Sequence, residues 1–455
     1  MKKIFYCVIA VMLAAMVFVA CSKSEAAASG TSAQAAAAPA NAGELTYVTF
    51  WNQGEPSANY LALCVDAFQK ETGVKVNFSP VGRDIMTKIR TDILSGNSPD
   101  LIDQDFVEIN AALMKGDDKG LLPLDDLLKS SGPDGEATFM DVFNKSEMDL
   151  FARDGSYYYI PYVKVTSGFF YNKTLFEKLG LNPPRTWDDF MTVNQKLKAN
   201  GIAPLALDGN ISFYNAYYYY WACTRVLGSG KFSAAANDAT GAAWDDPGFL
   251  QAAQMVYDLS KGGKNYFQDG YEGSAYPAAQ SDWALGKSGS VLCGTWIPNE
   301  TGQMVAQDWK YGFFAFPEVQ GAKGSYTDVE GYLMGYAIPK GAKNPDNAKK
   351  FIKFALKKEW AQTFVKMTDN MSGRKDVDPP AVLSDVTAYL ANATSAHKSY
   401  DGLMSDLPDW WANVFYPVDN DLIFGKITPK QFIDKIKTQT VAYWQGKVDL
   451  GANVR

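Results

Sequence analysis

The amino-acid sequence predicts an α/β fold in which helices cover both faces of largely parallel sheets. Between residues 45 and 105 the apolar pattern alternates in the order strand, helix, strand, helix, strand. That order predicts a parallel sheet that binds ligands beyond the carboxyl ends of its strands. A second set of strand-like and helical segments begins after Arg153. About 410 residues follow residue 43, which is enough for two domains with separate cores.

The first elements follow from periodicity and from residues that begin or end helices. Residues 45–51 form the first expected strand, and Ser57 is an expected cap for a helix with apolar residues at i, i+3, i+4 and i+7. Gly73 is expected to end this helix, and residues 74–78 alternate as the next strand. The third strand begins at Leu101, so polar residues that follow it are expected at the sheet edge that binds ligands.

Later segments carry equally specific signals for helices. Thr186 is expected to cap a helix that starts at Trp187, and Thr428 stands in a capping box with Gln431. A helix is expected over residues 344–354. The segment from Tyr217 to Val226 is also expected to be helical, and it is too aromatic to face water along its whole length. We therefore expect Tyr218, Tyr219 and Trp221 in a core.

The N-terminus resembles a bacterial lipoprotein signal. Lys2 and Lys3 precede an apolar run that stops at Cys21, and residues 22–43 are mostly small. We expect residues 1–20 to be a signal peptide, Cys21 to carry the lipid and residues 21–43 to be a flexible tether. Phe18 and Val19 depart from the usual motif, so an uncleaved membrane anchor is the alternative. Both interpretations place the rest of the chain outside the cytoplasm, at the outer face of the cytoplasmic membrane.

Composition excludes several classes of function. The net charge is −7 for the chain and −9 without Lys2 and Lys3, which argues against a nucleic-acid partner. The chain has one histidine, His397, in a polar stretch where we expect it at the surface; zinc sites with several histidine ligands are impossible. Beyond Cys21 the cysteines number three, which we expect as buried free thiols. We expect no cofactor, no metal and no enzymatic activity.

Aromatic residues next to planar polar residues favour a hydroxyl-rich ligand. The chain has 25 Tyr, 26 Phe and 11 Trp. Such a ligand needs aromatic rings for its apolar faces and polar side chains for its hydroxyls. The first cluster, at the end of the first strand, contains Trp51, Asn52, Gln53 and Glu55. The alternative for Trp51 is packing within a domain.

A series of motifs follows in order along the chain: Phe50-Trp51-Asn52, residues 94–102, residues 121–124, residues 159–162, residues 170–173, residues 179–181, residues 184–190, Gly294-Thr295-Trp296, Phe316-Pro317, residues 337–340 and Asn344-Pro345. Together these motifs resemble the family 1 extracellular solute-binding proteins of ABC importers, which include the maltose-binding protein. The resemblance implies a two-lobed periplasmic-binding-protein-like fold of type II with three hinge crossings. They would lie near Tyr162 to Val165, Phe314 to Pro317 and Met371 to Asp378. The implied lobe 1 is 44–161 plus 318–370, and lobe 2 is 162–317 plus 371–455.

The resemblance also implies further ligand-binding residues. Trp296 matches a position whose ring forms a floor for a sugar, and the others expected are Gln104, Asp105, Tyr162, Tyr214, Asn215, Glu330, Tyr332, Arg374, Trp410 and Trp411. Asp105 has the alternative role of a helix cap, and Arg374 that of a structural ion pair. Trp410 and Trp411 would point about 100° apart on a helix, so one of the two is expected in the cleft.

The expected function is therefore that of a monomeric receptor. It would capture a mono- or oligosaccharide between two lobes and deliver it to an ABC permease with a cytoplasmic ATPase, held to the membrane through Cys21. The alternatives are a surface glycosidase, a receptor without a transporter and a receptor of the same fold for a non-sugar solute such as a polyamine or phosphodiester.

Overall fold

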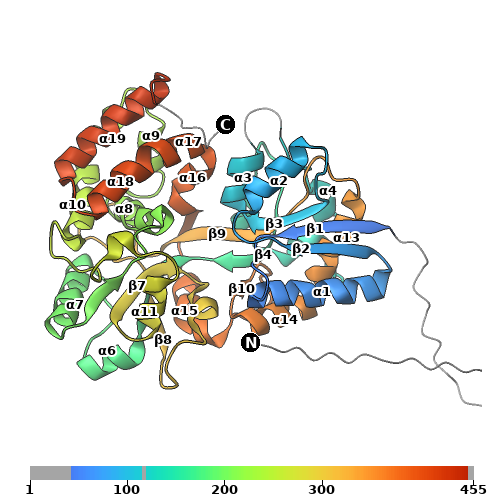
Figure 1. Ribbon diagram of the computed structural model, residues 1–455, viewed down its shortest axis with the longest axis horizontal. Coiled ribbons are helices and arrows are strands. Elements are labelled where there is room, and N and C mark those ends of the chain that lie inside the picture. Colours follow the sequence, from blue (N-terminus) through green and yellow to red (C-terminus); the bar gives the residue numbers. More distant parts are fainter. Residues whose placement is uncertain (1–42, 115–118, 449–455) are drawn as a thin grey trace, which may run out of the picture. The chain divides into compact units, whose positions relative to one another are not determined.

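Two sheets and the helices around them organise the chain (Figure 1). The computed structural model describes residues 43–114 and 119–448, which belong to one compact unit. The predicted signal, Cys21 and most of the predicted tether lie outside the described residues. The strands of the first sheet are β1 (Glu44–Thr49), β2 (Lys75–Pro80), β3 (Leu101–Asp105), β4 (Ile160–Val165), β9 (Asp328–Ala337), β10 (Met371–Ser372) and β11 (Ser395–Lys398).

The first sheet combines a parallel part with an antiparallel part. Strand β1 lies between β2 and β3 and is parallel to both, which confirms the parallel order predicted from residues 45–105. Strand β9 then runs antiparallel between β3 and β4. The other end of β9 pairs with β11, and β10 pairs with β4. The longest strand, β9, thus pairs with strands from three other parts of the chain.

The second sheet is smaller and mixed. Its strands are β5 (Ser167–Asn172), β6 (Ala203–Ala206), β7 (Ser288–Gly294) and β8 (Tyr311–Phe314), in the order β6-β7-β5-β8. Strands β6 and β7 are parallel, whereas β5 is antiparallel to both β7 and β8. The chain enters this sheet from β4 through Thr166 and returns to the first sheet between β8 and β9. It leaves the first sheet again after β10, and α15 then packs against β8.

Helices cover the sheets on both sides, in agreement with the predicted α/β class (Figure 1). Those around the first sheet are α1 (Pro56–Thr72), α2 (Ile85–Leu94), α3 (Phe106–Leu113), α4 (Asp125–Lys129), α5 (Lys145–Asp149), α13 (Pro345–Ala355) and α14 (Lys358–Thr368). The others are α6 (Lys173–Leu179), α7 (Trp187–Ala199), α8 (Ser212–Leu227), α9 (Lys231–Ala236), α10 (Pro247–Leu259), α11 (Ala278–Ala284), α12 (Ile297–Thr301), α15 (Ser384–Ala391), α16 (Leu403–Asp406), α17 (Pro408–Trp410), α18 (Tyr416–Ile423) and α19 (Pro429–Trp444). Short 3₁₀ turns and one π-helical turn complete the set: η1 (Phe139–Val142), η2 (Ala242–Asp245), η3 (Tyr271–Gly273), η4 (Ala381–Leu383), η5 (Ser399–Gly402) and η6 (Trp411–Phe415).

Most predicted helix ends are confirmed. Gly73 ends α1 with a left-handed φ of 72°, and both capping boxes form, at Thr186 and at Thr428. The prediction for Ser57 is wrong, because α1 begins one residue earlier, at Pro56. The fixed φ of proline suits the first helical position, so the helix starts there without a side-chain cap.

A second hydrophobic core, formed by the second sheet and the helices around it, explains the aromatic run in α8. Tyr218, Tyr219 and Trp221 are all fully buried, as predicted, among side chains from α10, α18 and α19. Cys64, Cys223 and Cys293 are buried free thiols, which confirms that prediction. Among the described residues, no helix is long and apolar enough to cross a membrane.

The prediction that His397 lies at the surface is wrong. Its side chain is 8% exposed, its Nε2 lies 2.5 Å from the Tyr220 hydroxyl, and its Nδ1 lies 3.1 Å from the Asp328 carboxylate. The polar residues around it in the sequence suggested an exposed loop. Strand β11 instead pairs with β9, and this pairing places the imidazole between α8 and the start of β9.

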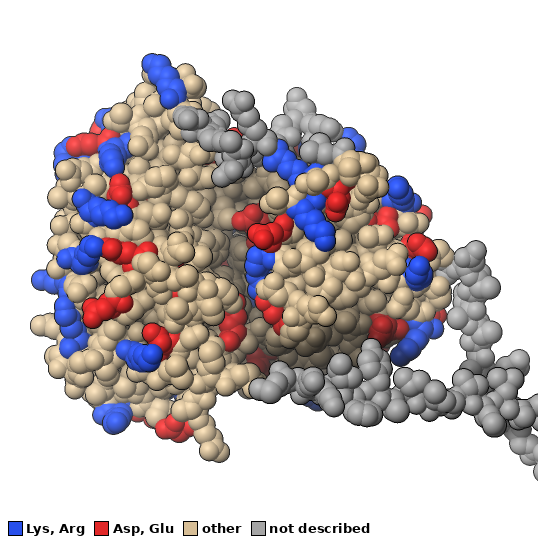
Figure 2. Space-filling model, viewed as in Figure 1, with Lys and Arg blue, Asp and Glu red and all other residues tan. Residues whose placement is uncertain are grey.

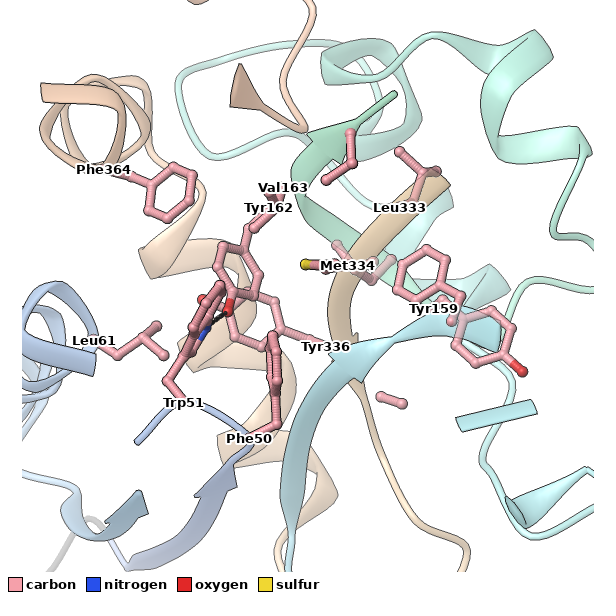
Figure 3. Packing of buried hydrophobic residues seen from close by; sticks show 14 of the residues in the cluster. Phe50, Trp51, Leu61, Tyr159, Tyr162, Val163, Leu333, Met334, Tyr336 and Phe364 are labelled. Carbon is pink, nitrogen blue, oxygen red and sulfur yellow. Dashed lines mark hydrogen bonds between the residues drawn. The ribbon is translucent and has the colours of Figure 1, made fainter. Parts of the chain in front are cut away.

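A chain of buried hydrogen bonds links the segment after β1 to β4 and β3, and Figure 3 shows its first bond, from Trp51 to Tyr162. The Trp51 indole donates to the Tyr162 hydroxyl at 2.7 Å, and that hydroxyl donates to the Asp103 carboxylate at 2.5 Å. Tyr47 donates to the other carboxylate oxygen at 2.9 Å. Burial raises the pKa of Asp103 to about 7, even though these hydroxyls favour the ionised form. The network fixes the Trp51 ring against the end of β4.

Replacing Tyr162 with Phe should destabilise the protein. The substitution removes one hydroxyl that is both donor and acceptor and leaves the Trp51 indole and one Asp103 oxygen without that partner. We expect the free energy of unfolding to fall by about 2 kcal/mol in urea titrations. Tyr257→Phe on α10 is the matched control, since its hydroxyl makes no hydrogen bond within the described residues. An equal effect in both variants would contradict the role of the network.

Candidate functional site

A cavity of about 680 Å³ lies between elements of the two sheets. Its lining from the side of the first sheet is Phe50, Trp51, Glu55, Pro56, Arg83, Gln104, Asp105 and Glu108. The facing wall consists of Ile211, Phe213, Tyr214, Tyr276, Pro277, Gln280, Ser281, Trp296, Asn299, Glu300 and Met304, and Tyr332, Met334, Met404 and Tyr416 complete it. The volume suits a small organic ligand. Figure 2 shows the surface hollowed between the two halves of the described chain, with acidic side chains on both sides.

Trp296 is placed by a glycine at the end of β7. Its side chain is 9% exposed, and its ring centroid lies 6.2 Å from that of Tyr332 and 6.5 Å from that of Phe213. A Cβ atom at Gly294 would lie 2.1 Å from the Trp296 ring, so no larger residue fits beneath it. Ligand contact by Trp296 itself stays a prediction.

Arg83 and Glu55 form the polar edge of the same wall as Trp51. The Arg83 guanidinium donates to the Glu55 carboxylate at 3.1 Å and to the Phe50 carbonyl at 2.9 Å. It also lies 5.1 Å from the ring centroids of Phe50 and Trp51, within the range of a cation–π contact. Glu55 also accepts from the Asn52 amide at 2.6 Å. This arrangement neutralises Glu55 without a ligand.

Asp105 and Glu108 lie where β3 gives way to α3. The Asp105 carboxylate accepts from the Glu108 backbone N–H at 2.8 Å, so Asp105 does cap the helix as the alternative interpretation held. It also lines the cavity, because the carboxyl end of β3 faces it. Burial raises the pKa of both carboxyl groups, and proximity to Asp105 raises that of Glu108 further. Gln104 turns its own amide oxygen onto the Asp105 backbone N–H at 2.9 Å.

The wall opposite carries Tyr214, Gln280 and Glu300. The Gln280 amide donates to the Tyr214 hydroxyl at 3.1 Å, and the Tyr276 hydroxyl donates to Glu300 Oε1 at 3.0 Å. Burial raises the pKa of Glu300 to about 7. The second oxygen of Glu300 and the amide oxygen of Gln280 are buried without a hydrogen-bond partner among the described residues. Two hydrogen-bond acceptors of this wall are therefore unpaired within the described residues.

Seven of the predicted ligand-binding residues line the cavity: Trp51, Glu55, Gln104, Asp105, Tyr214, Trp296 and Tyr332. Tyr162 lies behind Trp51 and does not line it. Asn52 and Gln53 are exposed beside the cavity edge, where Asn52 orients Glu55. The strand ends were therefore located correctly, but the direction of individual side chains was not.

The predictions that Asn215 and Glu330 lie at the ligand site are corrected, because both side chains make buried hydrogen bonds within the protein. The Asn215 amide donates to the Gly209 carbonyl and to Asn420, each at 2.8 Å. Glu330 accepts from the Ser399 hydroxyl at 2.5 Å and lines a different cavity, of about 470 Å³, with Lys164 and Glu147. Neither side chain belongs to the larger cavity.

Arg374 is held in a structural ion-pair cluster rather than the cleft. Its side chain is fully buried and binds Asp134 at 2.6 Å, Glu136 at 2.7 Å and Asp376 at 2.9 Å. It also donates to the Leu356 carbonyl. All of its donor nitrogens are therefore engaged, which leaves none for a ligand in this conformation.

Neither Trp410 nor Trp411 faces the cavity, so the expectation that one of them would is wrong. The Trp410 indole donates to Thr440 at 3.1 Å, and Trp411 packs on Phe415 with ring centroids 4.4 Å apart. Both belong to the second core. Other elements cover the helical segment on several sides, so two rings pointing about 100° apart can both be buried.

Sequence reasoning missed several cavity residues, among them Arg83, Glu108, Tyr276, Gln280 and Glu300. Two of these had a usable signal. Glu108 follows the predicted strand-end residue Asp105 by three positions, and Glu300 follows Trp296 by four, which is one helical turn in each case. Tyr276 and Gln280 come from a loop and a short helix whose position only the tertiary fold sets.

Comparison with known proteins agrees with this geometry. The sequence model for bacterial extracellular solute-binding proteins matches residues 51–362. A Brucella abortus protein is 28% identical over 350 residues, covering 74% of this chain and 77% of its own. The diacetylchitobiose binding protein NgcE of Streptomyces coelicolor is 25% identical over 65% of this chain and 62% of its own. A solved chitin oligosaccharide binding protein superimposes with a TM-score of 0.73 at 23% identity, over 89% of this chain and 99% of that one.

The fold is that of the two-lobed periplasmic binding proteins, with a cavity between its two sheets. The sequence also matches the family model over most of the chain, at residues 51–362. This chain belongs to the bacterial extracellular solute-binding protein family.

Replacing Gly294 with Ala should disturb the cavity through Trp296. The added methyl group would overlap the indole ring and force it to shift, with a loss of about 1 to 3 kcal/mol in the free energy of unfolding. The intrinsic tryptophan fluorescence should change with it. Gly273→Ala is the control, because a Cβ there would meet no atom within 4 Å. Unchanged fluorescence and stability in Gly294→Ala would contradict the placement of Trp296.

Proposed function

We propose that this protein is the receptor of an ABC importer and that it captures a carbohydrate in the cavity between the two sheets. The observation that carries the proposal is the lining of that cavity. Trp51, Tyr214 and Trp296 offer aromatic faces, and Gln104, Gln280 and Asn299 offer planar polar groups. Sugars present flat C–H faces and many hydroxyls, so they need both. The relatives named for chitin-derived sugars support the same ligand class.

Binding is proposed to be coupled to closure of the two lobes, with crossings after β4, between β8 and β9 and after β10. The proposed lobes are those implied by the sequence, 44–161 plus 318–370 and 162–317 plus 371–455. A ligand that contacts both walls favours the closed state by its difference in affinity for the two states. The proposed role needs no covalent step.

The cellular setting is proposed from the sequence and the family together. Residues 1–20 would direct export, and lipid on Cys21 would hold a monomeric receptor near its permease at the outer face of the membrane. Membership of an extracellular family supports export. Fractionation of cells, with and without Cys21→Ser, tests the anchor: release of the variant from the membrane fraction supports it.

A thermal-shift screen of mono- and oligosaccharides tests the ligand class. A sugar at 100 times its dissociation constant stabilises the protein by about 2.7 kcal/mol. Stoichiometric binding without cleavage products supports a receptor, whereas turnover of a glycan by the purified protein supports a glycosidase instead. Absence of stabilisation by every sugar would overturn the carbohydrate assignment.

For a sugar found in that screen, Trp296→Ala should weaken binding by about 30-fold, or ~2 kcal/mol, in isothermal titration calorimetry. The reason is the loss of a large aromatic contact on the cavity wall. Trp444→Ala is the matched control, since this half-exposed residue lies in α19 and not on the cavity wall. Equal affinities of the Trp296 variant and the unmodified protein would mean that Trp296 does not contact the sugar.

A further inference from the structure

The cavity carries more negative than positive charge. Four carboxylates line it, on Glu55, Asp105, Glu108 and Glu300, and Arg83 is the one basic residue among the described residues of its lining. Arg83 is already bonded to Glu55 and to the Phe50 carbonyl. One carboxylate, that of Glu55, thus has an ion-pair partner on this wall. Burial raises the pKa of Glu300, and the charge of Arg83 opposes this larger effect by lowering it.

Asp105, Glu108 and Glu300 form no ion pair with a lysine or arginine in the described parts of the chain. The contacts they do make are with neutral donors, namely a backbone N–H for Asp105 and the Tyr276 hydroxyl for Glu300. Within the described residues, neither Glu300 Oε2 nor Oε1 of Gln280, a residue only 3% exposed, has a hydrogen-bond partner. The vacant polar atoms are acceptors, so the missing partner is a donor.

A partner with positive charge fits this site better than a neutral one. A sugar hydroxyl can donate to a carboxylate, but it leaves the cost of burying the charge largely in place. An ammonium group brings three donors and the opposite charge, and hydrogen bonds between charged groups are stronger than neutral ones. Burial is the main cause of the raised pKa values of Glu108 and Glu300, so a positive partner beside them would favour their charged forms.

The aromatic rings around these carboxylates favour the same chemistry. Tyr276 is hydrogen-bonded to Glu300, Tyr332 and Tyr416 line the cavity with Asp105, and Trp296 stands one helical turn from Glu300. Ammonium groups bind well above the faces of such rings. Acidic groups on both walls would engage amines at more than one position of a ligand.

We propose that the cavity selects carbohydrates with free primary amines, that is amino sugars, through Asp105 and Glu108 on one wall and Glu300 on the other. This inference rests on the proposed function, since it specifies the sugar that the receptor binds.

Calorimetry with a matched pair of ligands tests the selection. The trisaccharide of glucosamine and its fully N-acetylated form share one backbone and differ in the charge of the amines. At neutral pH the free amine form should bind at least tenfold more tightly, and the preference should shrink in high salt. Equal affinity, or tighter binding of the N-acetylated form, would overturn the inference and leave the proposed function standing.

Variants that each lack one carboxylate test which residues select the free amines. Glu300→Gln and Glu108→Gln should each weaken binding of the glucosamine trisaccharide by about tenfold or more, and should reduce its advantage over the N-acetylated form. Glu359→Gln, an exposed change in α14 away from the cavity, should leave both affinities unchanged. Melting curves confirm that the variants are folded. If both cavity variants are folded and keep the full preference, the carboxylates do not determine it.

A third ligand separates the sugar from its amine. Spermidine carries protonated amines without a sugar ring. Binding of spermidine but of neither trisaccharide would overturn the amino-sugar inference while keeping recognition of amines, and the proposed carbohydrate function would then be decided by the wider screen of sugars. Binding of none of the three ligands would overturn the inference as well.

Discussion

The pairing of β9 with strands from three other parts of the chain, β3, β4 and β11, is the constraint on which the rest of this structure depends. Its second half lies between β3 and β4, so it connects the strand that ends at Asp105 with the strand that contains Tyr162. Its first half pairs with β11, where His397, Tyr220 and Asp328 meet. Gly335 allows the close approach, because a Cβ there would lie 2.1 Å from the Ile160 carbonyl oxygen. Tyr332, in the middle of the strand, reaches the cavity.

The cavity joins this strand to two walls of different electrostatic character. On one wall Arg83 satisfies Glu55, and the hydrogen bonds from Trp51 to Tyr162 and from Tyr162 to Asp103 hold the Trp51 ring in place. The other wall places Glu300 and Gln280 with acceptors that no described group satisfies. The polar groups around Trp51 are thus satisfied internally, whereas Glu300 and Gln280 each keep one acceptor without a partner among the described residues.

How much of the site could be predicted depended on the kind of signal. Trp51, Asp105 and Trp296 follow strands in the sequence, and strand ends of an α/β sheet converge on one edge, so their presence at the cavity could be predicted. Asn215, Arg374 and Trp410 had the residue types expected of a binding site. They lie in buried contacts with Asn420, with Asp134 and with Thr440, which are distant in the sequence. Residue type alone does not distinguish a ligand contact from such an internal one.

The sequence by itself determined the α/β class, the parallel strands β1 to β3, the end of α1 at Gly73, the start of α7 at Thr186 and the family, because each depends on local periodicity, capping residues or ordered motifs. The tertiary structure alone decided which polar residues face the cavity. It buried His397 through the pairing of β11 with β9, and it placed Tyr276 and Glu300 opposite Glu55. These outcomes depend on contacts between segments tens to hundreds of residues apart. No local pattern records which side chain such a contact will satisfy and which it will leave for a ligand.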